Sequence, residues 1–147
     1  MSAEVSKAIR QELKKVLPGI KFSVKTPHYG TVDIRWQDAV TRNQVEKIAH
    51  KYEYGHFDGM TDSYEYSNPR DDVPQCKFVF CVREYSEKAI EQAINATKDE
   101  FHLNGVPATP AMYNNGELYN IYVVGNSTLP HWSLQHQVSE KLSAMTF

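Results

Sequence analysis

Helix-start signals recur at regular intervals along this chain, and each follows two short runs of alternating apolar residues. Internal helices are predicted to begin near Thr41, Ser86 and Thr128 or Leu129, about 45 and about 43 residues apart. Two strands are predicted before each of these helices, and one further helix precedes the first pair. This order predicts an α+β fold, with an N-terminal helix followed by three strand-strand-helix units. Helices would pack on one face of a largely antiparallel sheet.

Local signals define the helices. The first covers about residues 3–17, where apolar residues recur at helical spacing until a Pro-Gly pair ends the run: Val5, Ile9, Leu13 and Val16. Thr41 and Gln44 form a capping box for the second helix. Ser86 caps the third helix, which is predicted to continue to about residue 103. The fourth is predicted from one apolar face, made of Leu134, Val138, Leu142 and Met145.

Strands are predicted from alternation of apolar and polar residues, at residues 21–25, 31–36, 60–66, 77–83, 111–113 and 118–124. The segment 77–83 is apolar on both faces, so we expect it to be the central strand of the sheet, with Phe78, Phe80 and Val82 buried. The Asn115-Gly116 pair predicts a hairpin between the last two strands. The Asp58-Gly59 pair predicts a tight turn with the glycine at positive φ.

Length and composition bound the remaining possibilities. A chain of 147 residues with a net charge of −2 is typical of one soluble domain, and we expect a single α+β domain over residues 1–147. The N-terminus does not resemble a signal peptide, and no window approaches the roughly 18 apolar residues of a membrane span, so we expect a cytoplasmic protein. Cys76 and Cys81 would face opposite sides of a strand, which predicts two free thiols.

Residues 51–72 are unusual in charge and in tyrosine content. Six carboxylates against two cations give this stretch a net charge of −4. His56, Asp58 and Asp62 lie close enough in sequence to suggest a general base, but we favour a structural role because the same residue types form turns and hydrogen bonds. No catalytic triad, phosphate loop or metal-ligand spacing accompanies them. We therefore expect no catalytic residue, no cofactor and no metal.

The chain resembles a known family over residues 9–86. The matching segments read IRQELKKVLPGIKFSVKT, VDIRWQDAVTRNQVEKIAHKY, FDGMTDSYEY and FVFCVREYS. They are similar to the large polyvalent protein-associated domains, specifically the twenty-ninth of that series. The resemblance implies a small α+β domain found in phage, plasmid and conjugative-element proteins. The family-like part would extend over about residues 1–103, and the additional hairpin and C-terminal helix over about residues 106–147 resemble nothing recognised.

Two main hypotheses follow for function. The first is a non-enzymatic protein-binding accessory module of a mobile genetic element, which counters a host defence system by docking on a basic host protein. Its surface would be acidic and rich in tyrosine, a residue enriched at interfaces: Tyr54, Asp58, Asp62, Glu65, Tyr66, Asp71 and Asp72.

The alternative hypothesis is a module that binds single-stranded nucleic acid through sheet aromatics and basic residues: Lys21, Lys25, Arg35, Trp36, Tyr119 and Tyr122. Charge favours protein binding, because the acidic stretch would repel phosphates unless it lies far from the basic residues. An enzyme of unknown class is the third hypothesis. The sequence does not predict the oligomeric state.

Overall fold

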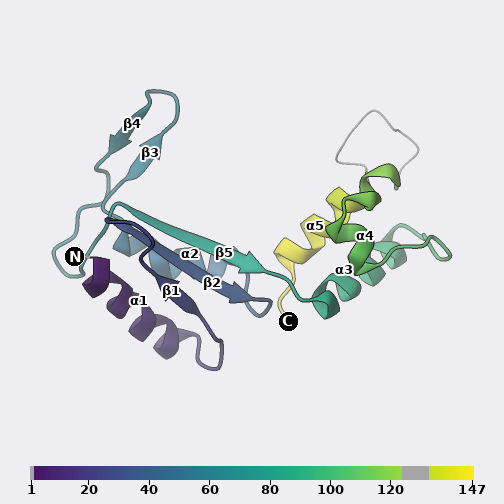
Figure 1. The fold of residues 1–147 in the computed structure, drawn as a ribbon, viewed down its shortest axis with the longest axis horizontal. Coiled ribbons are helices and arrows are strands. Elements are labelled where there is room, and N and C mark those ends of the chain that lie inside the picture. Colours follow the sequence, from purple (N-terminus) through teal and green to yellow (C-terminus); the bar gives the residue numbers. More distant parts are fainter. Residues whose placement is uncertain (1, 124–132) are drawn as a thin grey trace. The chain divides into compact units, whose positions relative to one another are not determined.

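The computed structural model describes residues 2–123 and 133–147, which group into two compact units, Met1–Glu84 and Tyr85–Phe147. The expectation of one domain over residues 1–147 stays a prediction. The described elements combine helices with mixed and antiparallel pairs of strands (Figure 1), so the α+β class is confirmed.

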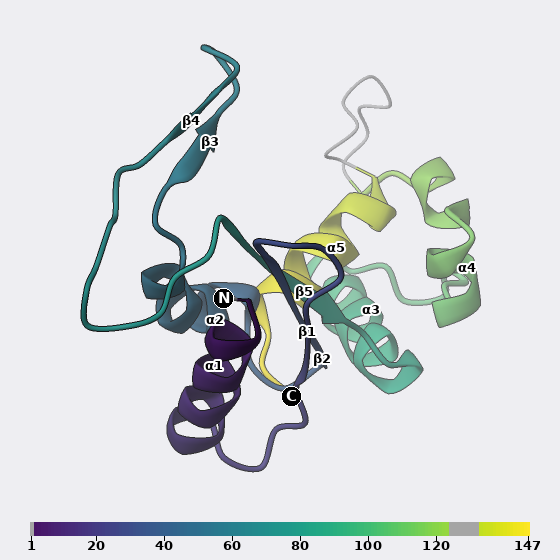
Figure 2. The same ribbon diagram turned by 60° about the vertical axis from the view of Figure 1, so that its left-hand side comes forward.

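Unit 1 contains a three-stranded sheet and a separate hairpin. Its elements in chain order are α1 (Ser2–Val16), β1 (Ser23–Lys25), β2 (Thr31–Gln37), α2 (Arg42–Ala49), η1 (His50–Tyr52), β3 (His56–Asp58), β4 (Ser63–Glu65) and β5 (Phe78–Glu84). The sheet has the order β1-β2-β5, in which β1 pairs antiparallel and β5 pairs parallel to β2. Strands β3 and β4 pair only with each other among the described residues, and they extend away from the sheet (Figures 1 and 2).

The helices of unit 1 begin where the sequence predicts, and they bury most of the apolar residues that it predicts. In α1, Val5, Ile9 and Leu13 are buried, whereas Val16 at the end of the helix is half exposed. The capping box of α2 is present, because Thr41 Oγ1 accepts from the Gln44 N–H and the Gln44 side chain accepts from the Thr41 N–H.

Both helices pack on the same face of the sheet. Their buried residues join one core with the even-numbered residues of β2, namely Val32, Ile34 and Trp36. The opposite face of the sheet carries the odd-numbered residues of β2 and is not covered by a described helix of unit 1. The sheet therefore has one buried and one open face within this unit.

The prediction of a central strand with Phe78, Phe80 and Val82 buried is wrong. β5 is the last strand in the order β1-β2-β5, and β2 is central. Phe80 pairs in register with Asp33, so it lies on the open face and is 49% exposed. Cys81 and Val79 face the helices instead. Both faces of this strand are apolar, and the side with the smaller residues packs against the core.

The two cysteines are free, as predicted, and both are buried. They do not lie on one strand, although the prediction assumed this. Cys76 precedes β5 rather than lying in it, and both thiols belong to the core of unit 1. Burial raises the pKa of the Cys76 thiol to about 11 and that of the Cys81 thiol to about 12. Both therefore remain protonated at neutral pH and are poor nucleophiles.

Unit 2 is helical in its described part. It contains α3 (Glu87–Glu100), α4 (Pro110–Asn114), η2 (Glu117–Asn120) and α5 (Leu134–Ala144). Its core is formed by buried residues from these elements, mainly Ile90, Ile94, Leu118, Leu134, Val138 and Leu142. Ser86 caps α3 as predicted, and Ser133 caps α5.

The hairpin predicted around Asn115 and Gly116 is wrong, and so is the third strand-strand-helix unit. Thr109 accepts from the Met112 N–H and Pro110 occupies the first helical turn, so residues 110–114 begin a helix instead of a strand. Gly116 has φ +78°, but it links α4 to η2. Residue 124 of the last predicted strand, and the helix start predicted near Thr128 or Leu129, lie outside the described residues.

Candidate functional site

Two aspartates shape the turn that closes the β3-β4 hairpin: Asp58 caps it by a hydrogen bond, and Asp62 adopts a positive φ. Asp58 Oδ1 accepts from the Met60 N–H at 2.9 Å, and this bond lowers the pKa of Asp58. The residue with positive φ is Asp62, at 52°, and not Gly59. A Cβ on Gly59 would meet open space. The predicted position of the turn is right, but the prediction of a positive φ at Gly59 is wrong.

The base of the hairpin is held by a glycine and a tyrosine. A Cβ added to Gly55 would overlap the backbone oxygen of Glu65, so only glycine permits this approach of the two segments. The Tyr64 hydroxyl donates to the carbonyl of Lys77 at 2.7 Å. The hairpin is thereby attached to the residues that lead into β5.

Aromatic rings form a continuous row from the hairpin to β5. Tyr54 stacks on Tyr66, with ring centroids 5.4 Å apart and planes 18° apart, and Tyr64 meets both rings edge-on. Tyr64 also contacts Phe78 edge-on at 5.5 Å, and Phe78 stacks on Phe80 at 5.7 Å. Five rings thus support one another, and the two end members, Tyr66 and Phe80, are exposed.

The hairpin presents its tyrosines and its carboxylates on different faces. Phe57 pairs with Tyr64, whereas Asp58 pairs with Ser63 and Glu65 with His56. Because paired residues of antiparallel strands share a face and successive residues alternate, one face is aromatic and the other polar. Alternation within residues 60–66 predicts that Tyr64 and Tyr66 are separated from Glu65, whereas the faces of Phe57 and Asp58 depend on which residues pair.

The acidic residues of the predicted surface are on the outside of the structure. Asp62, Glu65, Asp71 and Asp72 are exposed, and Asp58 is half-exposed. Asp72 is paired with Arg70, whose guanidinium lies 2.5 Å from a carboxylate oxygen and holds the pKa of Asp72 below its ordinary value. Asp71 and Asp72 lie in the loop after β4, away from the paired strands.

The set predicted for nucleic acid is not assembled as expected. Trp36 is 3% exposed and its Nε1 donates to the Val40 carbonyl, so it is a core residue and offers no stacking surface. Tyr119 and Tyr122 are exposed, but they lie in unit 2 and outside the sheet. Lys21, Lys25 and Arg35 are exposed in unit 1. The sheet aromatics that are accessible beside them, Phe78 and Phe80, were not among the predicted candidates.

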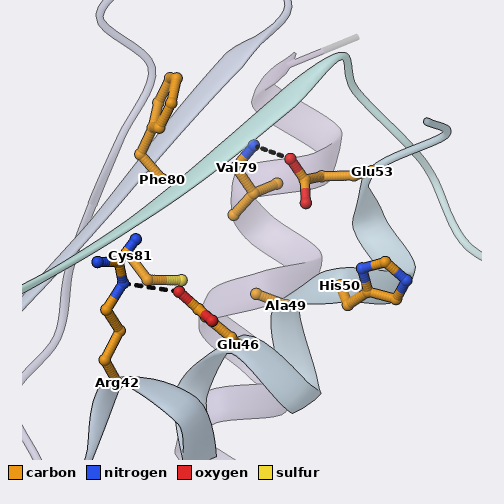
Figure 3. A pocket seen from close by; sticks show the side chains of 8 residues that line it. All are labelled: Arg42, Glu46, Ala49, His50, Glu53, Val79, Phe80 and Cys81. Carbon is orange, nitrogen blue, oxygen red and sulfur yellow. Dashed lines mark hydrogen bonds and ion pairs between the residues drawn. The ribbon is translucent and has the colours of Figure 1, made fainter. Parts of the chain in front are cut away.

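A pocket of about 250 Å³ lies between α2 and β5 (Figure 3) and was not predicted from the sequence. It is lined by Arg42, Glu46, Ala49, His50, Glu53, Val79, Phe80 and Cys81. Glu53 Oε2 accepts from the Val79 N–H at 3.0 Å, and burial raises the pKa of Glu53. This carboxylate satisfies a backbone group at the edge of β5. The other acid, Glu46, is paired with Arg42 at 2.6 Å. The acids of the pocket are engaged in the structure, and its thiol is protonated.

The catalytic interpretation of His56, Asp58 and Asp62 gains no support. His56 Nδ1 lies 2.8 Å from the Ser67 hydroxyl, and Asp58 caps the turn. Within residues 2–123 and 133–147, no three His, Cys, Asp or Glu side chains are grouped so that they could hold a metal ion. None of the described helices has the length and apolar character that crossing a membrane requires.

Comparison with known protein families gives a match over the first unit. The model of the family described as large polyvalent protein associated domain 29 matches residues 1–86. No curated protein and no solved structure matches the chain. The matched segment is unit 1 with the next two residues, so the family is represented by the sheet, its two helices and the hairpin. The match confirms the resemblance predicted for residues 9–86, and the chain belongs to the large polyvalent protein associated domain 29 family.

Proposed function

We propose that this chain is a non-enzymatic protein-binding module of a mobile genetic element, and that its β3-β4 hairpin docks on a basic host protein. One observation carries the proposal: the same hairpin exposes large apolar side chains and, on its other face and turn, carboxylates without a salt-bridge partner in the described part of the chain. Phe57 is 53%, Met60 98% and Tyr66 69% exposed. Asp62 in the turn and Glu65 at the end of β4 are exposed as well.

The arrangement of the tyrosines favours binding. Tyrosine offers a large apolar ring and a polar hydroxyl, and it loses little conformational entropy when it is buried in an interface. Tyr66 is already held by its stack on Tyr54, so part of this entropy is lost before a partner arrives. The aromatic face would supply affinity, and the carboxylates on the polar face would steer a basic partner.

The identity of the partner class rests on the family resemblance and on charge. Domains of this family are expected in proteins of phages, plasmids and conjugative elements, which encounter host defence systems. Defence proteins that act on nucleic acid carry basic grooves, and an acidic hairpin is complementary to such a groove. We infer that countering a host defence protein is the biological role of this contact.

The test compares two pairs of charge reversals in affinity capture from host-cell extract. Asp62→Lys with Glu65→Lys changes the hairpin, and Glu91→Lys with Asp99→Lys makes the same charge change on exposed positions of α3. We expect a partner that the parent and the α3 variant retain equally and that the hairpin variant loses by at least about tenfold. A third variant, Tyr66→Ala, should lose the same partner.

The variants must also fold as the parent does. Circular dichroism should show the same folded content in all variants, because the changed side chains are exposed. If the hairpin variant and the α3 variant capture the same proteins in the same amounts as the parent, the hairpin is not a docking surface and the proposal is wrong.

A further inference from the structure

A basic corner lies where α1 leads into β1. Two hollows of about 360 Å³ and about 320 Å³ adjoin there and share Lys21 and Phe22. The first is lined by Arg10, Leu13, Lys14, Gly19, Ile20, Lys21 and Phe22. It therefore combines three cations with an apolar floor and has no carboxylate in its lining. The second hollow runs from Lys21 across β1 to Arg35 of β2, and its lining includes one carboxylate, Glu84.

The cations of the first hollow are available to a ligand. In the described part of the chain, Arg10, Lys14 and Lys21 take part in no ion pair. Arg10 donates from Nη2 to the Val24 carbonyl at 2.6 Å, which fixes the guanidinium beside the hollow. Arg35 is shared between Asp33 and Glu84 at 3.3 and 3.6 Å. The surplus of positive charge is thus concentrated at the corner.

The open face of the sheet offers a stacking surface on β5, two strands across from β1. The register places Lys25, Asp33 and Phe80 in one row across the three strands, and Ser23, Arg35 and Val82 in the next. Phe80 stacks nearly parallel on Phe78, with 17° between the ring planes. Exposed aromatic rings beside cations on a sheet face are the combination that binds unpaired bases and their phosphates.

We propose that the open face of the sheet in unit 1, together with the basic corner, binds single-stranded nucleic acid. Phosphates would contact Arg10, Lys14 and Lys21, and a base would stack on Phe80. The acidic hairpin extends from the end of the sheet opposite to the α1-β1 connection (Figures 1 and 2), so its carboxylates lie away from the phosphate contacts at the basic corner. Duplexes bind less well, because their bases are already stacked on one another. This site shares no residue with the proposed protein-docking hairpin, although Tyr64 of the hairpin contacts Phe78, which stacks on Phe80.

The test uses the full chain and fluorescence anisotropy with a labelled oligothymidylate of about 20 nucleotides, which is longer than the footprint of a small single-strand-binding fold. We expect Phe80→Ala to weaken binding about tenfold, whereas Phe57→Ala, which removes an equally exposed ring from the hairpin, leaves it unchanged. Lys14→Glu with Lys21→Glu should weaken binding at least tenfold and lower the salt slope by about one to two. The matched control is Lys47→Glu with Lys88→Glu, at exposed positions elsewhere.

Two further measurements separate base stacking from attraction by charge alone. Polyglutamate of the same length should bind more weakly than the oligothymidylate, because it has no bases to stack. If the two polymers bind equally, or if Phe80→Ala binds as the parent does, the face recognises only charge and the proposal is wrong. Absence of binding by the parent at low salt also overturns it. The hairpin variant Asp62→Lys with Glu65→Lys should retain oligothymidylate binding, so this proposal and the protein-docking proposal can fail separately.

Discussion

Gly55 and Gly59 belong to the same hairpin, but only Gly59 has room for a side chain. The backbone of Glu65 occupies the space that a side chain on Gly55 would need, whereas Gly59 is open and has no positive φ. The identity of a glycine in the sequence does not show which of these applies. Only the approach of β4 makes Gly55 necessary.

We predict that Gly55→Ala destabilises the hairpin by about 1–3 kcal/mol, because either the strand or the Gly55 backbone must shift. Gly59→Ala should change its stability by less than about 0.5 kcal/mol. Hydrogen exchange of the hairpin amides measures both effects directly. Equal protection in the two variants would contradict the close approach of Gly55 to Glu65.

Glu12 links α1 to the segment after α2. It accepts from Lys51 Nζ at 2.6 Å and from the Tyr52 hydroxyl at 2.5 Å. Burial alone would raise the pKa of Glu12, but these hydrogen bonds outweigh it and the pKa is lowered. Burial and the bond to Glu12 raise the pKa of Tyr52. Because the pKa of this acid is depressed by folding, its contribution to stability is present above its unfolded pKa and is lost as the pH falls through its folded pKa.

We therefore predict that Glu12→Gln lowers the free energy of unfolding by about 1 kcal/mol at neutral pH, a figure reduced by the partial exposure of the pair. The difference between the variant and the parent should shrink as the pH falls below the ordinary pKa of a glutamate and vanish below the lowered folded pKa of Glu12, because the parent carboxylate is then protonated too. Urea unfolding at several pH values tests this. Glu91→Gln, at an exposed position of α3, should show no such dependence. A difference between Glu12→Gln and the parent that stays constant with pH would show that charge is not the cause.

Among the elements, β5 shows how neighbours decide the orientation of a strand. Alternation predicted a strand, and the strand is present. Phe78 and Phe80 are larger than Val79 and Cys81, so residue size favoured the wrong face. The parallel register with β2 places Cys81 beside Ile34 above the helices. Pairing with β2 thus fixes which side of β5 faces the core.

The orientation of β5 can be tested by a pair of alanine substitutions. Ile34→Ala should lower the free energy of unfolding by about 2–5 kcal/mol, because Ile34 is fully buried and the change leaves a cavity. Phe80→Ala should cost only about 1 kcal/mol, mainly through loss of its stack on Phe78. Urea unfolding of the full chain, monitored by far-ultraviolet circular dichroism, gives both values. If Phe80→Ala is as destabilising as Ile34→Ala, the face of β5 that carries Phe80 is the buried one and this orientation of the strand is wrong.

Among the residues that the structure describes, the buried hydrophobic side chains form two cores. One uses residues from Val5 to Cys81, and the other uses residues from Ala89 to Leu142. Within unit 1 the charges are separated as well, since the acidic hairpin and the basic corner lie at opposite ends of the sheet (Figure 1). The sequence-based objection to nucleic-acid binding, that acidic residues would repel phosphates, therefore does not apply to the basic corner.

Features that depend only on residues close together in the sequence could be predicted from it. The stripe of Val5, Ile9 and Leu13 specified α1, and the Thr41 box specified the start of α2, because such signals act within one turn of helix. The family match and the position of the hairpin turn also followed from local sequence. These features need no knowledge of distant segments.

Features that depend on pairing between distant segments required the folded chain. The open face with Phe80, the burial of Trp36 and the face of the hairpin on which Phe57 lies all follow from strand register. The same alternating sequence can place either face toward the core, and the choice rests on the free energy of packing against helices far along the chain. Residues 110–120 formed helices because a local cap and a proline outweighed the Asn-Gly hairpin signal, with Leu118 buried among the helices of unit 2.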